Sequence, residues 1–130
     1  MRAFSGFPEG KTGLVRLPES VFTDLLPLVD DLNELKVILH VLYRLQQGKG
    51  AMRYVSQRSL LSDPVLLRGM DGPEAVRAAL ARAVERGVLL QIEAEVDGHP
   101  DVVYLANSPR GRAALEALRQ GVPLKEPPPP

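Results

Sequence analysis

The chain has 130 residues, of which 45% are hydrophobic and 25% are charged, and a chain of this size and composition typically builds one globular domain. It contains no cysteine, which excludes disulfide scaffolds, thiol catalysis and cysteine-ligated metal sites. Sixteen basic and sixteen acidic residues give a net charge of zero, so an anionic partner would have to bind a local basic patch. There is no signal-peptide pattern and no apolar run of membrane length, so we expect a cytoplasmic protein without a membrane partner.

The N-terminal half predicts an arm followed by two helices. Residues 1–17 are rich in glycine and predict an extended arm. Pro18 favours the first position of a short helix that ends at Pro27. Asp31, followed by Glu34 three residues later, is typical of a capping box, and the helix that it begins is apolar on most sides. We expect this helix at the centre of the fold, with one polar stripe at a spacing of four residues: Lys36, His40 and Arg44.

The C-terminal half predicts short strands and helices, with a hairpin near its end. The expected elements are a strand at 52–55, a helix capped by Ser56, an apolar turn at 66–70, a helix over 73–86, strands at 89–96 and 102–105, and a helix capped by Ser108. Residues 97–101 form the turn cluster between the two long strands. Prolines at 123 and 127–130 predict an extended tail or linker.

This order of elements predicts an α+β, mainly α-helical fold: a winged helix-turn-helix with a C-terminal β-hairpin wing and flanking helices. The helix over 73–86 takes the recognition position and the hairpin forms the wing. We expect an N-terminal arm at 1–17, the winged-helix domain at 18–121 and a proline-rich linker or tail at 122–130. The last segment suggests that the sequence could be half of a longer protein. Winged helices bind DNA or proteins, so the fold alone does not define a function.

Three segments carry a family resemblance: residues 33–45, Tyr54 to Ser56, and Glu74 to Leu90. Together they resemble the N-terminal domain of DnaD-like primosomal replication proteins, over roughly residues 14 to 120. The resemblance implies a self-associating module for replication initiation, with much of the DNA binding in a further domain that has an aromatic-containing motif. This chain has no tryptophan and reaches its prolines before any such domain.

The distribution of charge indicates where a nucleic acid could bind. The segment 36–58 contains basic residues and no acid, and the expected wing at 91–104 contains acids and no base. Phosphate contacts need lysine or arginine, so an acidic wing would be repelled by a duplex. The candidate DNA-binding residues are Lys49, Arg53 and Arg58 in the basic segment and Arg77, Arg82 and Arg86 on the recognition helix. Two other interpretations stay open: these arginines form a solvated face, or the basic segment of one copy meets the acidic wing of another.

Motifs for catalysis or metal binding are incomplete. Gly10, Lys11 and Thr12 copy the end of a phosphate-binding loop, but Ser5 stands where that loop needs a glycine and no buried strand precedes it. The two histidines, His40 and His99, have no metal-ligand partner at a useful spacing. We therefore expect no enzyme activity, no catalytic residue, no metal, no cofactor and no small-molecule substrate.

The leading hypothesis is a non-catalytic module of a DnaD-like replication initiation protein. It would form a homo-oligomer and contribute to binding of DNA or of other primosome proteins. The alternative is a dimeric winged-helix transcription regulator that reads duplex DNA, and a third hypothesis is a domain that only docks a protein partner. The oligomeric state and the preference for single- or double-stranded DNA are left open by the sequence.

Overall fold

The computed structural model describes residues 3–10, 13–48, 52–121 and 124. Its elements are a π-helical turn η1 (Val21–Leu25), α1 (Leu32–Gln47), β1 (Val55–Ser56), α2 (Gln57–Leu61), α3 (Pro64–Arg68), α4 (Gly72–Arg86), β2 (Leu89–Val96), β3 (His99–Ala106) and α5 (Pro109–Arg119). The expected α+β class, rich in helix and with one hairpin, is confirmed. Within the described residues, no helix combines the length and apolar character needed to cross a membrane.

The three strands form one antiparallel sheet in the order β1-β3-β2. Strands β2 and β3 pair along their full length, from Leu89 opposite Ala106 to Val96 opposite His99. Only Asp97 and Gly98 separate them, with φ angles of 51° and 80°. Two successive positive φ values match the twist of a tight hairpin, and Asp-Gly is a favoured sequence for such a turn. The expected five-residue turn at 97–101 was therefore wrong, because residues 99–101 belong to β3.

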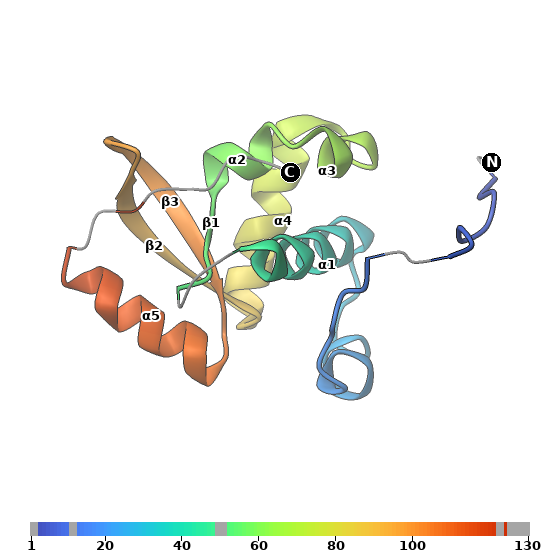
Figure 1. Ribbon diagram of the computed structural model, residues 1–130, viewed down its shortest axis with the longest axis horizontal. Coiled ribbons are helices and arrows are strands. Elements are labelled where there is room, and N and C mark those ends of the chain that lie inside the picture. The colour runs from blue at the N-terminus through green and yellow to red at the C-terminus, as the bar shows by residue number, and fades with distance from the viewer. Residues whose placement is uncertain (1–2, 11–12, 49–51, 122–123, 125–130) are drawn as a thin grey trace.

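The sheet separates two apolar cores, one on each face. In Figure 1, α1 and α4 lie on one side of the hairpin and α5 lies on the other. The larger core contains Val37, Ile38 and Val41 of α1, Val76 and Leu80 of α4, and Leu89 and Tyr104 of the sheet. The smaller core contains Val96, Val103, Leu105, Ala114, Leu118 and Leu124. Alternate residues of β3 point to opposite faces, so each core receives every second side chain of this strand.

A single residue after α5 continues the sheet at its outer edge. Leu124 forms a parallel bridge with Val96; its amide donates to the carbonyl of Glu95 (3.1 Å), and its carbonyl accepts from the amide of Asp97 (2.9 Å). Its side chain is buried in the smaller core. Apart from Leu124, the expected tail at 122–130 lies outside the described residues, as do Lys11 and Thr12 of the rejected phosphate loop.

Three predicted helix caps are confirmed. The side chain of Asp31 accepts from the amide of Glu34, that of Ser56 from Ser59, and that of Ser108 from Gly111. Ladder hydrogen bonds in the first strand are confined to Val55 and Ser56, which pair with Tyr104 and Val103. The expected strand over 52–55 was therefore wrong at residues 52–54, because β1 begins at Val55.

Two further details of the helices differ from the prediction. The expected helix over 18–27 is only the five-residue turn η1, because prolines at both ends leave too little chain for regular helical hydrogen bonds. On α5, the apolar pattern of the sequence predicts that Ala113, Leu115 and Leu118 are buried, whereas Ala114 and Leu118 are buried and Ala113 is exposed.

Candidate interaction surfaces

The arginines of α4 differ in their surroundings. Arg77 is exposed and forms an ion pair with Glu74 one turn earlier on the same helix. Arg82 and Arg86 both lie against the start of α1, where their partners are Asp30 and Glu34. All three guanidinium groups, which the sequence made candidates for DNA binding, thus already face a carboxylate.

The contact between Arg86 and Glu34 joins α4 to α1. Glu34 is 0% exposed, and its two carboxylate oxygens accept from Nε and Nη2 of Arg86 at 2.5 and 2.9 Å. Arg86 also donates from Nη1 to the carbonyl oxygen of Leu28 (2.7 Å). The hydrogen bond with Glu34 raises the pKa of Arg86 above its ordinary value. Because a buried carboxylate is costly without partners, the first role that the structure gives Arg86 is to hold Glu34.

The candidate DNA-binding residues of the predicted basic segment also differ in their surroundings. The Nη1 atom of Arg53 donates to the carbonyl oxygens of Leu45 (3.3 Å), Gln46 (3.1 Å) and Gly48 (2.9 Å), which are the free carbonyls at the end of α1. A cation at this end also interacts favourably with the helix dipole. Arg58 is exposed on α2 and has no ion pair with the part of the chain that the structure describes. Lys49 lies outside the described residues.

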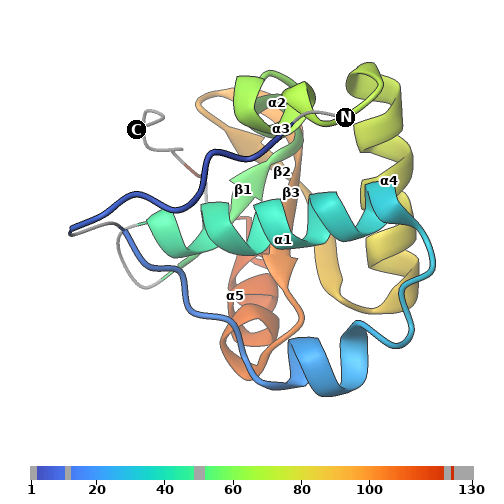
Figure 2. The ribbon, with the colours of Figure 1, turned by 90° about the vertical axis from the view of Figure 1, so that its right-hand side faces the viewer.

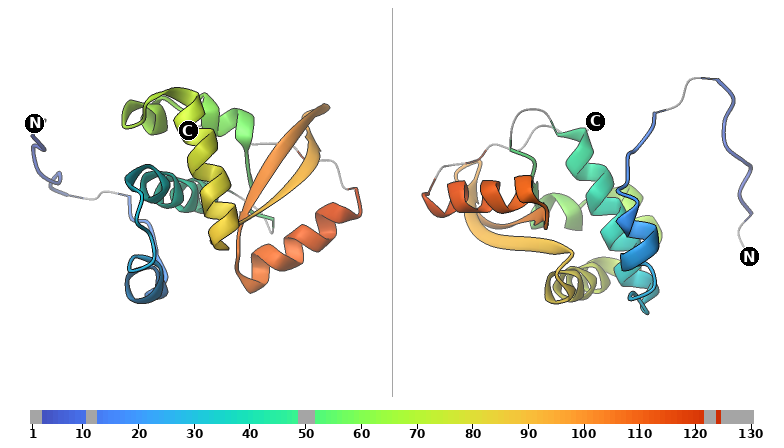
Figure 3. Two further views of the ribbon diagram at one scale, coloured as in Figure 1. Left: turned by 180° about the vertical axis from the view of Figure 1, so that it is seen from behind. Right: turned by 90° about the horizontal axis from the view of Figure 1, so that it is seen from below.

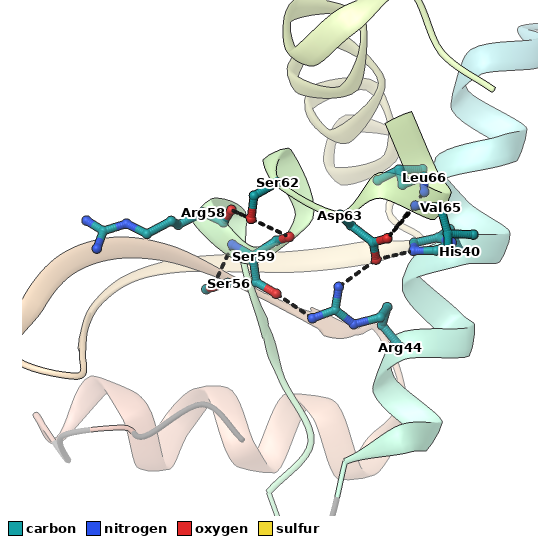
Figure 4. A network of polar contacts seen from close by, with 9 residues as sticks. All are labelled: His40, Arg44, Ser56, Arg58, Ser59, Ser62, Asp63, Val65 and Leu66. Atoms are coloured by element: carbon teal, nitrogen blue, oxygen red, sulfur yellow. Dashed lines mark hydrogen bonds and ion pairs between the residues drawn. The ribbon is translucent and has the colours of Figure 1, made fainter. Parts of the chain in front are cut away.

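The polar stripe of α1 holds the segment α2–α3, as Figure 4 shows. Asp63 caps α3 by accepting from the amides of Val65 and Leu66. The other oxygen of this carboxylate lies 2.7 Å from Nε2 of His40 and 2.8 Å from Nη1 of Arg44. Burial alone would raise the pKa of Asp63, but the hydrogen bonds with His40 and Arg44 outweigh this effect and lower the pKa below its ordinary value.

The remaining contacts of the stripe agree with a structural role. Arg44 also donates from Nη2 to the hydroxyl of Ser59, and Lys36 donates to the carbonyl of Gly69 at the end of α3 (2.9 Å). Ser59 therefore faces a guanidinium and has no contact with His40, so the Ser, His and Asp side chains do not form a nucleophilic triad. The described residues also include no group of three metal-ligating side chains.

The hairpin carries the acidic surface that the sequence predicted. Glu93, Glu95 and Asp97 are exposed on β2 and the turn, and Asp101 on β3 is partly exposed. In the register of the sheet, Glu93 and Glu95 point to the face occupied by Leu89. Their positions lie beyond the part of that face packed by α4, so the distal half of the hairpin presents carboxylates to solvent.

A groove brings together arginines that are far apart in the sequence. It has a volume of about 720 Å³ and lies between α1, α5 and the root of the N-terminal arm. Its apolar lining includes Leu17, Leu42 and Leu45, and the arginines around it are Arg16, Arg53 and Arg110. Among the residues that the structure describes, no acidic one lines it. Sequence reasoning missed this site because its arginines lie in three separate segments and form no local charge run.

The N-terminal arm and the turn that follows it leave large apolar side chains in water. The exposed large hydrophobic residues of the described chain are Phe4, Phe7, Leu14, Val15, Phe22, Leu28, Leu32, Tyr43 and Val65. Seven of these nine lie between residues 4 and 32. Figures 1 and 3 show residues 3–10 projecting from the helices and the sheet, and Figure 2 views the molecule from this side, with the arm drawn across the helices. Phe4 and Phe7 also contact each other, with ring centroids 5.0 Å apart, and exposed apolar groups that gather in this way favour an interaction site.

No protein-family model matches the chain, and no curated protein matches it at a significant level.

Proposed function

We propose that this chain is a non-catalytic winged-helix module that self-associates in the assembly of a DnaD-like replication initiation complex. The observation that supports the winged helix is the sheet order β1-β3-β2, with α2, α3 and α4 inserted between β1 and β2. In this arrangement α4 occupies the recognition position and the β2–β3 hairpin the wing. The replication role rests on the sequence resemblance alone.

Self-association is supported by the apolar residues of the N-terminal segment. Phe7 and Leu14 are each 90% exposed, although burial of a side chain of this size is worth about 1.5–3 kcal/mol. A second surface that covers these side chains would recover this free energy. We therefore assign the N-terminal segment, with the groove beside it, to contacts between copies.

The charges on α4 and the hairpin argue against a regulator that reads duplex DNA. A recognition helix needs arginines that are free to contact base edges, whereas Arg77, Arg82 and Arg86 each face a carboxylate. The wing is acidic and would lie close to phosphates. Among the predicted DNA-binding residues that the structure describes, Arg58 has the most freedom to reach phosphate, and a contact of this kind is weak and independent of sequence.

Sedimentation velocity over a wide range of protein concentration, together with a DNA titration at two salt concentrations, tests this function. We expect oligomers that form as the concentration rises, and weak, salt-sensitive binding without sequence preference. Arg58→Ala should weaken the DNA interaction further. Arg119→Ala is the matched control, because it removes the same charge from α5, where Arg119 pairs with Glu116. A strictly monomeric chain that selects one duplex sequence would refute the proposal and favour the regulator.

A further inference from the structure

We propose that the chain dimerises by arm exchange: the phenylalanines of one copy's N-terminal arm occupy the groove between α1 and α5 of a second copy. This inference rests on the proposed self-association and adds the segment and the surface that produce it. The segment is residues 3–10, with Phe4 and Phe7 as its apolar anchors. The surface is the groove lined by Leu17, Leu42 and Leu45 together with Arg16, Arg53 and Arg110.

The root of the arm is fixed beside the groove. The amide of Arg16 donates to Oε1 of Gln46 (2.8 Å), and Nε2 of Gln46 donates back to the carbonyl oxygen of Arg16. Two hydrogen bonds from one side-chain amide attach this point of the backbone to the end of α1. The arm therefore leaves the domain next to the groove of its own copy, while Phe4 and Phe7 remain 72% and 90% exposed. Their rings contact each other, with centroids 5.0 Å apart in an edge-to-face arrangement.

The groove and the arm are complementary in polarity and in charge. Leucine, proline and alanine side chains form most of the apolar lining, which suits phenyl rings. Within residues 3–10 the only charged side chain is Glu9, two residues after Phe7, and among the residues that the structure describes the groove lining has three arginines and no acid. Complementary charges favour the correct register of an association. A nucleic acid strand is the less suitable occupant, because its bases stack on aromatic side chains and the groove has none.

The area available is large enough for a stable dimer. Burial of one phenylalanine side chain removes about 150–250 Å² from water. A reciprocal exchange buries four rings, and the groove walls that receive them lose a comparable area, so the total approaches the roughly 1,200–2,000 Å² of a standard interface. Reciprocal exchange also closes the assembly at two copies, because each copy offers the same arm and the same groove.

The first experiment compares dimer dissociation constants by sedimentation. The double substitution Phe4→Ala/Phe7→Ala should weaken the dimer by at least about a hundredfold and leave the fold intact, because both residues are exposed. Phe22→Ala is the matched control, since Phe22 is an exposed phenylalanine (57%) that does not line the groove. It should leave the dissociation constant unchanged. Equal losses in both variants would indicate general apolar association and overturn the inference.

The second experiment uses the absence of native cysteine. A Ser5→Cys chain mixed with a Pro18→Cys chain should form a disulfide-linked heterodimer on mild oxidation, because Pro18 is exposed and lines the groove. Ser5→Cys mixed with Ala78→Cys, an exposed position on α4, should give only background cross-linking. If a chain with both Ser5→Cys and Pro18→Cys closes internally while the mixed single variants do not cross-link, the arm binds its own groove and the exchange is refuted.

The outcomes separate this inference from the proposed function. A wild-type chain that stays monomeric at every concentration contradicts both. A wild-type oligomer that is unaffected by Phe4→Ala/Phe7→Ala contradicts only the arm exchange, and self-association must then use another surface.

Discussion

Substitution of Gly111 by alanine tests how closely α5 approaches the sheet. In most helices a change from glycine to alanine stabilises the fold by about 1 kcal/mol. Here the new Cβ atom would lie 1.8 Å from the carbonyl oxygen of Ala106, in the backbone at the end of β3. No side-chain rotation relieves this overlap, so the start of α5 would have to move by roughly 1.5 Å. Overpacking against fixed structure typically costs about 1–3 kcal/mol.

The same displacement would weaken two other contributions to stability. The hydroxyl of Ser108 accepts from the amide of Gly111 (3.0 Å), and a cap of this kind is worth about 1 kcal/mol. Ala114 and Leu118, further along α5, would lose part of their packing in the smaller core. After the gain in helix propensity is subtracted, we expect Gly111→Ala to lower the free energy of unfolding by about 2–3 kcal/mol.

Urea unfolding followed by circular dichroism measures this change. Gly69→Ala is the matched control, because Gly69 has a negative φ of −102° and its nearest new contact would be the flexible end of Lys36 at 3.7 Å. It should change the free energy of unfolding by less than about 0.5 kcal/mol. If Gly111→Ala is as stable as the wild type, or more stable, the close approach of α5 to Ala106 is refuted.

Two further predictions concern the ion pairs. Arg86→Ala should lower the melting temperature by about 5 °C or more, since it leaves the buried Glu34 without its bidentate partner. Arg77→Ala, whose partner Glu74 is exposed, should leave the melting temperature nearly unchanged. Equal effects of the two substitutions in thermal unfolding would contradict this difference. Asp63 has a lowered pKa in the folded state, so its charged form stabilises the fold above the unfolded-state pKa of about 3.9, and this contribution is lost as the pH falls through the folded-state pKa. The stability difference between the wild type and Asp63→Asn should therefore shrink as the pH falls below about 4; a difference that is independent of pH in acid unfolding would show that the carboxylate charge has no such role.

The sequence predicted the parts of the fold that depend on local chemistry. Asp31, Ser56 and Ser108 cap helices as expected, because a short oxygen-bearing side chain before an apolar run satisfies free amide groups in any context. The helix over 73–86 and its stop at Gly87 were also confirmed; Gly87 has a φ of 90°, which favours glycine. The hairpin was predicted, but with a turn of residues 97–101. Asp97 and Gly98 alone form the turn, and the polar pattern of residues 99–101 concealed that they already belong to β3.

The candidate site was less predictable because it depends on contacts between distant segments. Arg82 was expected on the helix over 73–86, and it lies there with an exposed side chain. The sequence pattern could not show that Asp30, just before α1, and Glu34, in its first turn, lie opposite Arg82 although they are more than forty residues away in the chain. The capping-box pattern was half correct: Asp31 caps α1, but the Glu34 carboxylate pairs with Arg86. The groove arginines come from three segments, so no local pattern could have found them.

The bridge between Leu124 and the outer strand has a consequence for behaviour in concentrated solution. An uncovered strand at the margin of a sheet is a template for further strands and for fibril growth. Here Leu124 already forms backbone hydrogen bonds with Glu95 and Asp97 at this edge. The acidic side chains of β2 add mutual repulsion between neighbouring molecules. In the proposed arm exchange, copies of this chain would therefore meet through their arms and grooves while their sheets stay separate, which would keep the assembly finite.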